Sequence, residues 1–210
     1  MELAKIVGSA TLMLVVLNPF LLTVYLLGLV RTLRLREFAS VLARAAAWSG
    51  IVFALFAWLG DMIFSDVLQV RFAAFLVFGG IVFVLVAVRF MFQGPQALEA
   101  LRGDAQPSAG AIAMPFLIGA GSINASVLAG SRQTLAGALV AIALALTVTV
   151  VTVVGLKTVH DRVNERYEKV VARYVDLCGR SSSLVIGAMA VEMIFQGLEK
   201  WLAHLGGVAH

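Results

Sequence analysis

The residues best suited to chemistry lie in two short elements that would interrupt a helix, Asn18-Pro19 and Gly119-Ala120-Gly121-Ser122. Proline has no N–H and its ring clashes with the carbonyl one turn earlier, so Pro19 opens the helix and Asn18 can cap the half-helix that follows. Near Pro115, the two glycines let the backbone leave helical geometry, and Ser122 can cap the helix that resumes. Helix N-termini offer free N–H groups and partial positive charge, which suit a carboxylate.

We therefore expect a small zwitterionic substrate to place its carboxylate between the two breaks. The candidate substrate-binding residues are Asn18, Pro19, Pro115, Gly119, Gly121, Ser122 and Asn124. A purely structural role is the alternative for each break, because proline and glycine are common in membrane helices as kinks and close-packing points. Two breaks at matching depth favour a site over two unrelated kinks.

Glu192 and Arg89 are candidates for coupling transport to a proton. Glu192 is the acid placed well inside an apolar stretch, where an ionisable group is expensive and often functional. A structural ion pair or snorkelling explains Glu192 equally well, and Arg89, nearer a helix end, fits snorkelling better. No cofactor or metal is expected, because Cys178 is the single cysteine and no phosphate-binding Gly-x-x-x-x-Gly-Lys-Ser/Thr loop occurs.

The composition requires that these residues be held by membrane-spanning helices. Hydrophobic residues make up 61% of the chain and charged residues 13%, and the mean hydropathy is +0.98. Soluble domains are roughly half apolar and a quarter charged, so a water-soluble fold is excluded. The apolar runs lack the alternation of barrel strands, which leaves helices. We predict an all-α membrane protein with six spans at 6–30, 38–60, 72–92, 109–129, 134–156 and 184–202.

The distribution of basic residues predicts the orientation of these spans. With six spans, 12 of the 16 basic residues fall in or beside the loops after spans one, three and five, and four fall on the other side. The positive-inside rule makes the first side cytoplasmic and places both termini outside. The net charge of +4 is explained by this orientation, so no nucleic-acid partner is expected. Membrane lipid is the expected partner, and a homo-oligomer remains open.

Two short matches predict an internal duplication. Pro19-Phe20-Leu21 recurs as Pro115-Phe116-Leu117, and Phe92-Gln93-Gly94 recurs as Phe195-Gln196-Gly197. They lie at corresponding places in two halves of three spans, about 6–94 and 109–203. An odd number of spans per half inserts the second half upside down, as in the inverted repeats of secondary transporters. The prediction is thus a single transmembrane domain, residues 1–210, with helices one and four broken.

One long polar stretch, about 157–181, follows the fifth span. Apolar residues recur in it every three or four positions and charged residues fill the other faces. This pattern is typical of an amphipathic helix at the cytoplasmic membrane surface or docked on the bundle. A connector helix is the main interpretation and a regulatory gate the alternative.

Three stretches of this sequence resemble the MarC family of bacterial and archaeal inner-membrane proteins, also described as small neutral amino acid transporters. They are Leu17-Asn18-Pro19-Phe20, Phe78-Gly79-Gly80-Ile81 with the following Arg89-Phe90-Met91-Phe92, and the run from Ala113 to Ile123. The resemblance covers nearly the whole chain in order. Two positions depart from it: the family usually has Gly-Pro-Gly in place of Gly119-Ala120-Gly121, which would weaken the second break, and often an amide in place of Glu192.

The resemblance implies an inner-membrane secondary transporter that exports or exchanges small neutral amino acids such as glycine or alanine, and no enzyme. Transport of another small solute or ion is the first alternative. A membrane enzyme acting on lipid phosphates is a less favoured one, because the three histidines lie outside the predicted spans and no span holds paired acids.

Overall fold

The structure is a computed structural model that describes residues 2–60, 62–64, 70–93, 117–162 and 165–206, and these residues contain no strand. The helices in chain order are α1 (Glu2–Leu17), α2 (Pro19–Tyr25), α3 (Leu27–Thr32), α4 (Leu35–Leu59), α5 (Phe72–Gln93), α8 (Ala120–Arg132), α9 (Leu135–Arg162) and α10 (Glu165–Gly206). Helices suit this apolar sequence because each satisfies its own backbone hydrogen bonds. The all-helical prediction is confirmed for this part of the chain.

Four stretches within the described residues are long and apolar enough to cross a membrane. They are Glu2–Thr23, Leu35–Leu59, Phe72–Gln93 and Leu135–Arg162, and each overlaps one of the predicted spans. The predicted span 109–129 is described only from residue 117, where the short helix α8 follows, and the predicted span 184–202 lies inside α10. A multi-pass helical membrane protein is therefore established, whereas the count of six spans and the inverted repeat stay predictions.

The predicted amphipathic segment 157–181 is divided between two helices. Residues 157–162 form the last turns of α9, which ends at Arg162. Residues 165–181 form the first part of α10, which continues without interruption as a helix of 42 residues through the predicted sixth span. The placement of this segment at the cytoplasmic surface stays a prediction.

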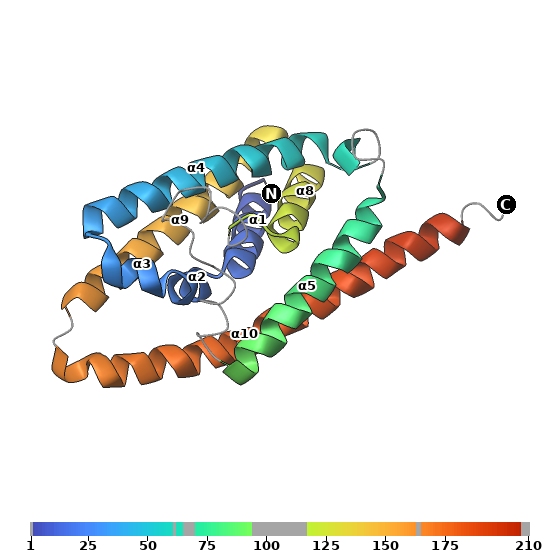
Figure 1. Cartoon of the computed structure of the whole chain (residues 1–210). Helices are drawn as coiled ribbons and strands as arrows, with labels where there is room; N and C mark the ends of the chain where they lie inside the picture. The colour runs from blue at the N-terminus through green and yellow to red at the C-terminus, as the bar shows by residue number, and fades with distance from the viewer. Residues whose placement is uncertain (1, 61, 65–69, 94–116, 163–164, 207–210) are drawn as a thin grey trace.

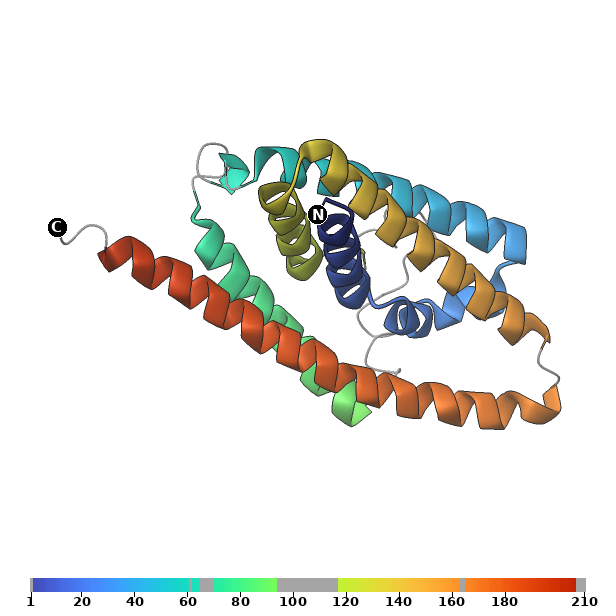
Figure 2. The same cartoon turned by 180° about the vertical axis from the view of Figure 1, so that it is seen from behind.

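The helices form a bundle with a two-helix arm beside it. In Figures 1 and 2, α1, α4, α8 and α9 pack together, while α5 and α10 run antiparallel along one side. The core of the bundle contains large side chains such as Met13, Phe38 and Phe53 together with the fully buried alanines Ala45 and Ala138. Small residues at such positions let membrane helices approach closely.

Glycines set the closest helix contacts. A Cβ at Gly80 of α5 would lie 2.6 Å from Ile194 Cγ1 of α10, and one at Gly197 of α10 would lie 2.7 Å from Val77 Cγ2 of α5. In the bundle, a Cβ at Gly130 of α8 would collide with the carbonyl of Ala57 in α4. Where the hydrophobic effect is weak, such tight packing is a main source of helix association.

Candidate functional site

The chain breaks at Asn18, between α1 and α2. Asn18 has a φ of 39°, a left-handed conformation that asparagine tolerates better than most residues. Its N–H donates to the Leu14 carbonyl at 2.9 Å, the last ladder bond of α1. Its side-chain Oδ1 accepts the N–H of Leu21 at 3.1 Å, which is the N-cap interaction expected from the sequence. The chain changes direction here, as Figure 1 shows.

The second break lies directly before α8. Gly119 is extended, with φ −123° and ψ 170°, and is the N-cap residue of α8. The Ser122 hydroxyl accepts the Gly119 N–H at 2.9 Å and donates to the Leu117 carbonyl at 2.7 Å. The assignment of Ser122 as the cap is therefore wrong: Ser122 is the third residue of the helix, and its hydroxyl holds the preceding turn in place. Pro115 lies outside the described residues.

A cavity of about 280 Å³ joins the two breaks. The end of α1 and the turn leading into α8 form one side of it, and α5, α2 and α10 supply the rest. The lining residues are Val15, Val16, Leu17, Leu21, Leu22, Tyr25, Phe75, Phe78, Gly79, Val82, Phe83, Val86, Leu117, Ile118, Gly119, Ala120, Gly121, Ser122, Ile186, Met189, Ala190 and Met193.

The sequence-predicted site residues are only partly brought together in this cavity. Gly119, Gly121 and Ser122 line it, whereas Asn18, Pro19 and Asn124 are not among the lining residues. At the first break, Leu17 at the end of α1 and Leu21 in the first turn of α2 line the cavity, but the break residues themselves do not. The start of α2 also has few donors to offer a ligand, because Pro19 has no N–H and Asn18 Oδ1 already accepts the N–H of Leu21.

The two helix ends that face the cavity have opposite polarity. The N–H groups of Ala120, Gly121 and Ser122 have no carbonyl partner inside α8, whose first ladder bond runs from the Ile123 N–H to the Gly119 carbonyl at 3.0 Å. At the end of α1, the Val15 carbonyl loses its usual donor because residue 19 is a proline. Donors on one side and acceptors on the other suit a ligand that carries a negative and a positive group.

Apolar side chains form the remainder of the lining. Among the lining residues that the structure describes, Tyr25 and Ser122 are those with polar side chains, and none is charged. The ring of Phe83 lies beside the start of α8, since a Cβ at Gly119 would be 2.8 Å from its Cζ atom. The cavity therefore has a polar end at the two breaks and an apolar wall on α5 and α10.

A polar chain outside the cavity links α8 to α10. The Asn124 side chain donates from Nδ2 to Gln196 Oε1 at 3.3 Å. Gln196 donates from Nε2 to Glu192 Oε1 at 3.0 Å, one helical turn away on α10. The structure therefore brings the predicted residues Asn124 and Glu192 together through Gln196, which the sequence reasoning missed. The repeated Phe-Gln-Gly motif and the four-residue spacing from Glu192 were the signals that pointed to it.

Arg89 is separate from this chain. It is exposed near the end of α5, and no ion pair joins it to Glu192 among the residues that the structure describes. Within the described part of the chain, Arg89 and Glu192 therefore form no ion pair with each other, and a coupling role for either residue stays a prediction.

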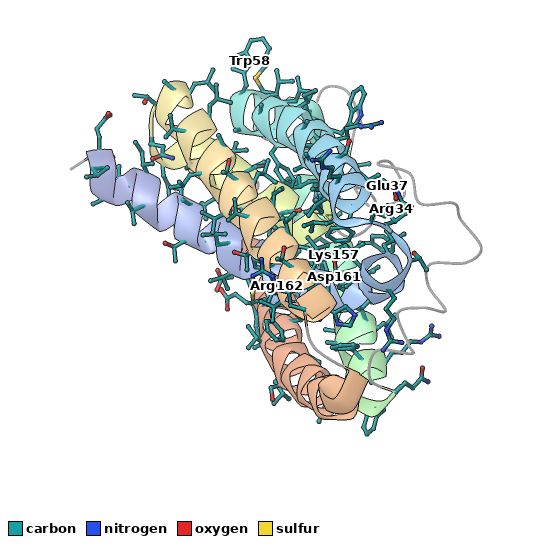
Figure 3. The ribbon with its side chains drawn as sticks, turned by 90° about the vertical axis from the view of Figure 1, so that its left-hand side faces the viewer. Arg34, Glu37, Trp58, Lys157, Asp161 and Arg162 are labelled. Carbon is teal, nitrogen blue, oxygen red and sulfur yellow. The ribbon has the colours of Figure 1, made fainter. Side chains whose placement is uncertain are left out.

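Lys157 is a second residue that the sequence reasoning missed, because it was counted only as a marker of the cytoplasmic side. It is buried and donates from Nζ to the Val30 carbonyl at 2.7 Å and to Asp161 Oδ1 at 3.1 Å. It also lies 5.6 Å from the ring centroid of Phe38. The ammonium thus ties α9 to the end of α3 and to α4. Figure 3 shows Lys157 and Asp161 close together on α9.

Comparison with known proteins supports the classification that these features indicate. No curated protein matches the chain, and no solved structure matches it. The sequence model of one family, described as MarC family integral membrane protein, matches residues 3–202. The match covers nearly the whole chain and contains both helix breaks, the cavity-lining residues and the Asn124–Gln196–Glu192 chain. The protein therefore belongs to the MarC family of integral membrane proteins.

Proposed function

We propose that this protein is a secondary transporter, not an enzyme, that exports or exchanges small neutral amino acids of the glycine and alanine class. The single observation that carries the proposal is the cavity where the start of α8 and the end of α1 meet. Interrupted backbone at membrane depth is costly unless a cavity or ligand satisfies it. The sites of secondary transporters are built from such interrupted helices.

The polarity of the two helix ends favours a zwitterion. A substrate carboxylate would accept hydrogen bonds from the free N–H groups of Ala120 and Gly121, and the positive end of the α8 dipole would add roughly 0.3–2 kcal/mol. The ammonium group would donate to carbonyls at the end of α1, beginning with that of Val15. Neither interaction needs a charged side chain, which agrees with the uncharged lining of the described cavity.

The breaks also supply the movement that transport requires. Asn18 lies between α1 and α2 with a positive φ, and Gly119 directly precedes α8 with an extended backbone. Residues with non-helical backbone angles at the ends of helices can absorb φ/ψ changes during conformational transitions. Rocking of the α5–α10 pair against the bundle would expose the cavity first to one side and then to the other. We place the protein in the cytoplasmic membrane with both termini outside, from the distribution of its basic residues.

Transport in proteoliposomes tests the proposal. The purified protein should exchange labelled glycine or alanine with the same unlabelled amino acid inside the vesicles, and imposed pH and sodium gradients would identify the coupling ion. Protein-free vesicles give the background. Absence of exchange above that background with every neutral amino acid would reject the proposed function.

Two substitutions connect the activity to the breaks. Asn18→Ala removes the cap on Leu21 and places alanine at a positive φ, and Ser122→Ala releases the turn at Gly119. Each should lower flux roughly tenfold or more, because small misplacements of binding groups are costly, while membrane insertion is retained. Ser131→Ala is the matched control, since this exposed serine bonds only within its own helix at 3.0 Å. Wild-type flux in both test variants would remove the breaks from the mechanism.

A further inference from the structure

The cavity is larger than glycine or alanine requires. An apolar cavity of about 150 Å³ holds benzene, so on the same scale about 280 Å³ accommodates roughly eleven non-hydrogen atoms. That is about twice the size of glycine or alanine and close to the size of leucine, methionine or phenylalanine. A small amino acid bound at the polar end would leave much of the apolar part unfilled.

The apolar part begins directly beside the polar end. Phe83 lies against Gly119, and a Cβ at Gly121 would be 3.5 Å from Met193 Sδ. Phe75, Val82 and Ala190 extend this wall along α5 and α10. A substrate whose carboxylate meets the start of α8 would therefore direct its side chain along this wall.

Water is not expected to fill the apolar part of the cavity. A buried water needs two to four polar partners. The polar side chains of the described lining are Tyr25 and Ser122, and the Ser122 hydroxyl already bonds to Leu117 and Gly119. An apolar substrate side chain would fill the space without needing hydrogen bonds, whereas a charged one would find no counter-charge among the described lining residues.

We propose that this wall is a side-chain pocket that makes the site prefer neutral amino acids with large apolar side chains, such as leucine, isoleucine, methionine or phenylalanine, over glycine and alanine. The inference rests on the proposed transport function and extends its substrate class from glycine and alanine to larger neutral amino acids, which the same site would bind more tightly. One additional methylene that fits a hydrophobic pocket raises the preference for a substrate by about tenfold or more. Leucine should therefore bind at least tenfold more tightly than glycine.

Competition against labelled alanine in proteoliposomes tests the preference in the wild-type protein. Unlabelled leucine and methionine should halve alanine exchange at concentrations at least tenfold below that of glycine, and aspartate and lysine should have little effect. If alanine exchange is intact but leucine and methionine compete no better than glycine, the side-chain pocket is rejected and the proposed function survives. If no neutral amino acid is exchanged, both are rejected.

One pair of variants then locates the pocket. Val82 lines the cavity and is 41% exposed, so a larger side chain there can occupy cavity space without overpacking a sealed core. Val82→Phe should weaken competition by leucine about tenfold relative to competition by glycine, with both measured against whatever alanine exchange the variant retains. Val88→Phe is the matched control, since Val88 is 47% exposed on the same helix and is not among the lining residues. Equal leucine competition in Val82→Phe and Val88→Phe would overturn the assignment of this wall, and misfolding of either variant would leave the wild-type competition to decide.

Discussion

Replacing Lys157 with methionine should destabilise the contact between α9 and the end of α3. Methionine keeps an unbranched apolar stem and removes the ammonium that donates to the Val30 carbonyl at 2.7 Å. If the helix continued, the Arg34 N–H would pair with this carbonyl, but that N–H instead donates to Glu37 Oε2 at 3.2 Å. The substitution therefore leaves a buried carbonyl unpaired.

The geometry gives the size of the effect. An unpaired buried polar group costs about 1–3 kcal/mol. Losing the contact with the Phe38 ring at 5.6 Å adds roughly 0.5–1 kcal/mol. The Asp161 side chain is 41% exposed, so water replaces its lost partner and the pair itself contributes at most about 1 kcal/mol. Methionine also removes the desolvation penalty of the buried Lys157 charge, and this gain opposes the losses. The net destabilisation is therefore about 2 kcal/mol.

Thermal unfolding of detergent-solubilised protein, followed by tryptophan fluorescence, measures this difference. For a chain of this size, about 2 kcal/mol lowers the melting temperature by roughly 4–8 °C. Lys5→Met is the control, since Lys5 is exposed near the start of α1, and it should melt with the wild type. Asp161→Asn should cost less than Lys157→Met. An unchanged melting temperature for Lys157→Met, or a larger loss for Asp161→Asn, would refute the role assigned to the Val30 carbonyl.

Two further predictions concern α8 and its partners. Gly130→Ala should lower the free energy of unfolding by about 1–3 kcal/mol, because the new Cβ meets the Ala57 carbonyl. Gly8→Ala, which has nothing within 4 Å of its Cβ, should melt at or above the wild-type temperature. Equal melting temperatures for the two variants would contradict the close approach of α4 and α8. If Glu192 carries the coupled proton, Glu192→Gln should abolish the pH dependence of amino acid exchange and Gln196→Leu should shift it, and an unchanged profile in both would retire that role.

Local chemistry made the helix breaks predictable from the sequence. Asn18-Pro19 combines a residue that caps helices and tolerates a positive φ with one that cannot continue a hydrogen-bond ladder, and this combination needs no tertiary information. The spans were predictable for the same reason, since a run of apolar residues in a bilayer has few alternatives to a helix. Four of them overlap the apolar helical stretches of the structure, with ends that differ by at most seven residues.

Which end of each broken helix faces the cavity was not predictable, because it depends on packing between distant parts of the chain. The sequence indicated free N–H groups at both breaks, but the donors at the start of α2 are missing at Pro19 or used by Asn18, and α1 faces the cavity with its carbonyl end. Lys157 was misjudged for a related reason. The positive-inside rule counts charges without regard to burial, and only the packed structure shows that this lysine is enclosed.

The departure at Ala120 from the family's usual proline changes the chemistry of the second break without removing it. Ala120 is the first residue of α8, the position where proline is favoured because its N–H would have no helical partner. The break does not need the ring, because Gly119 is extended and the Ser122 hydroxyl holds the turn through two hydrogen bonds. Alanine keeps an N–H that proline would lack, and this N–H belongs to a residue that lines the cavity. Alanine at position 120 therefore adds a backbone N–H donor at the place where we propose that the substrate carboxylate binds, and the break is kept.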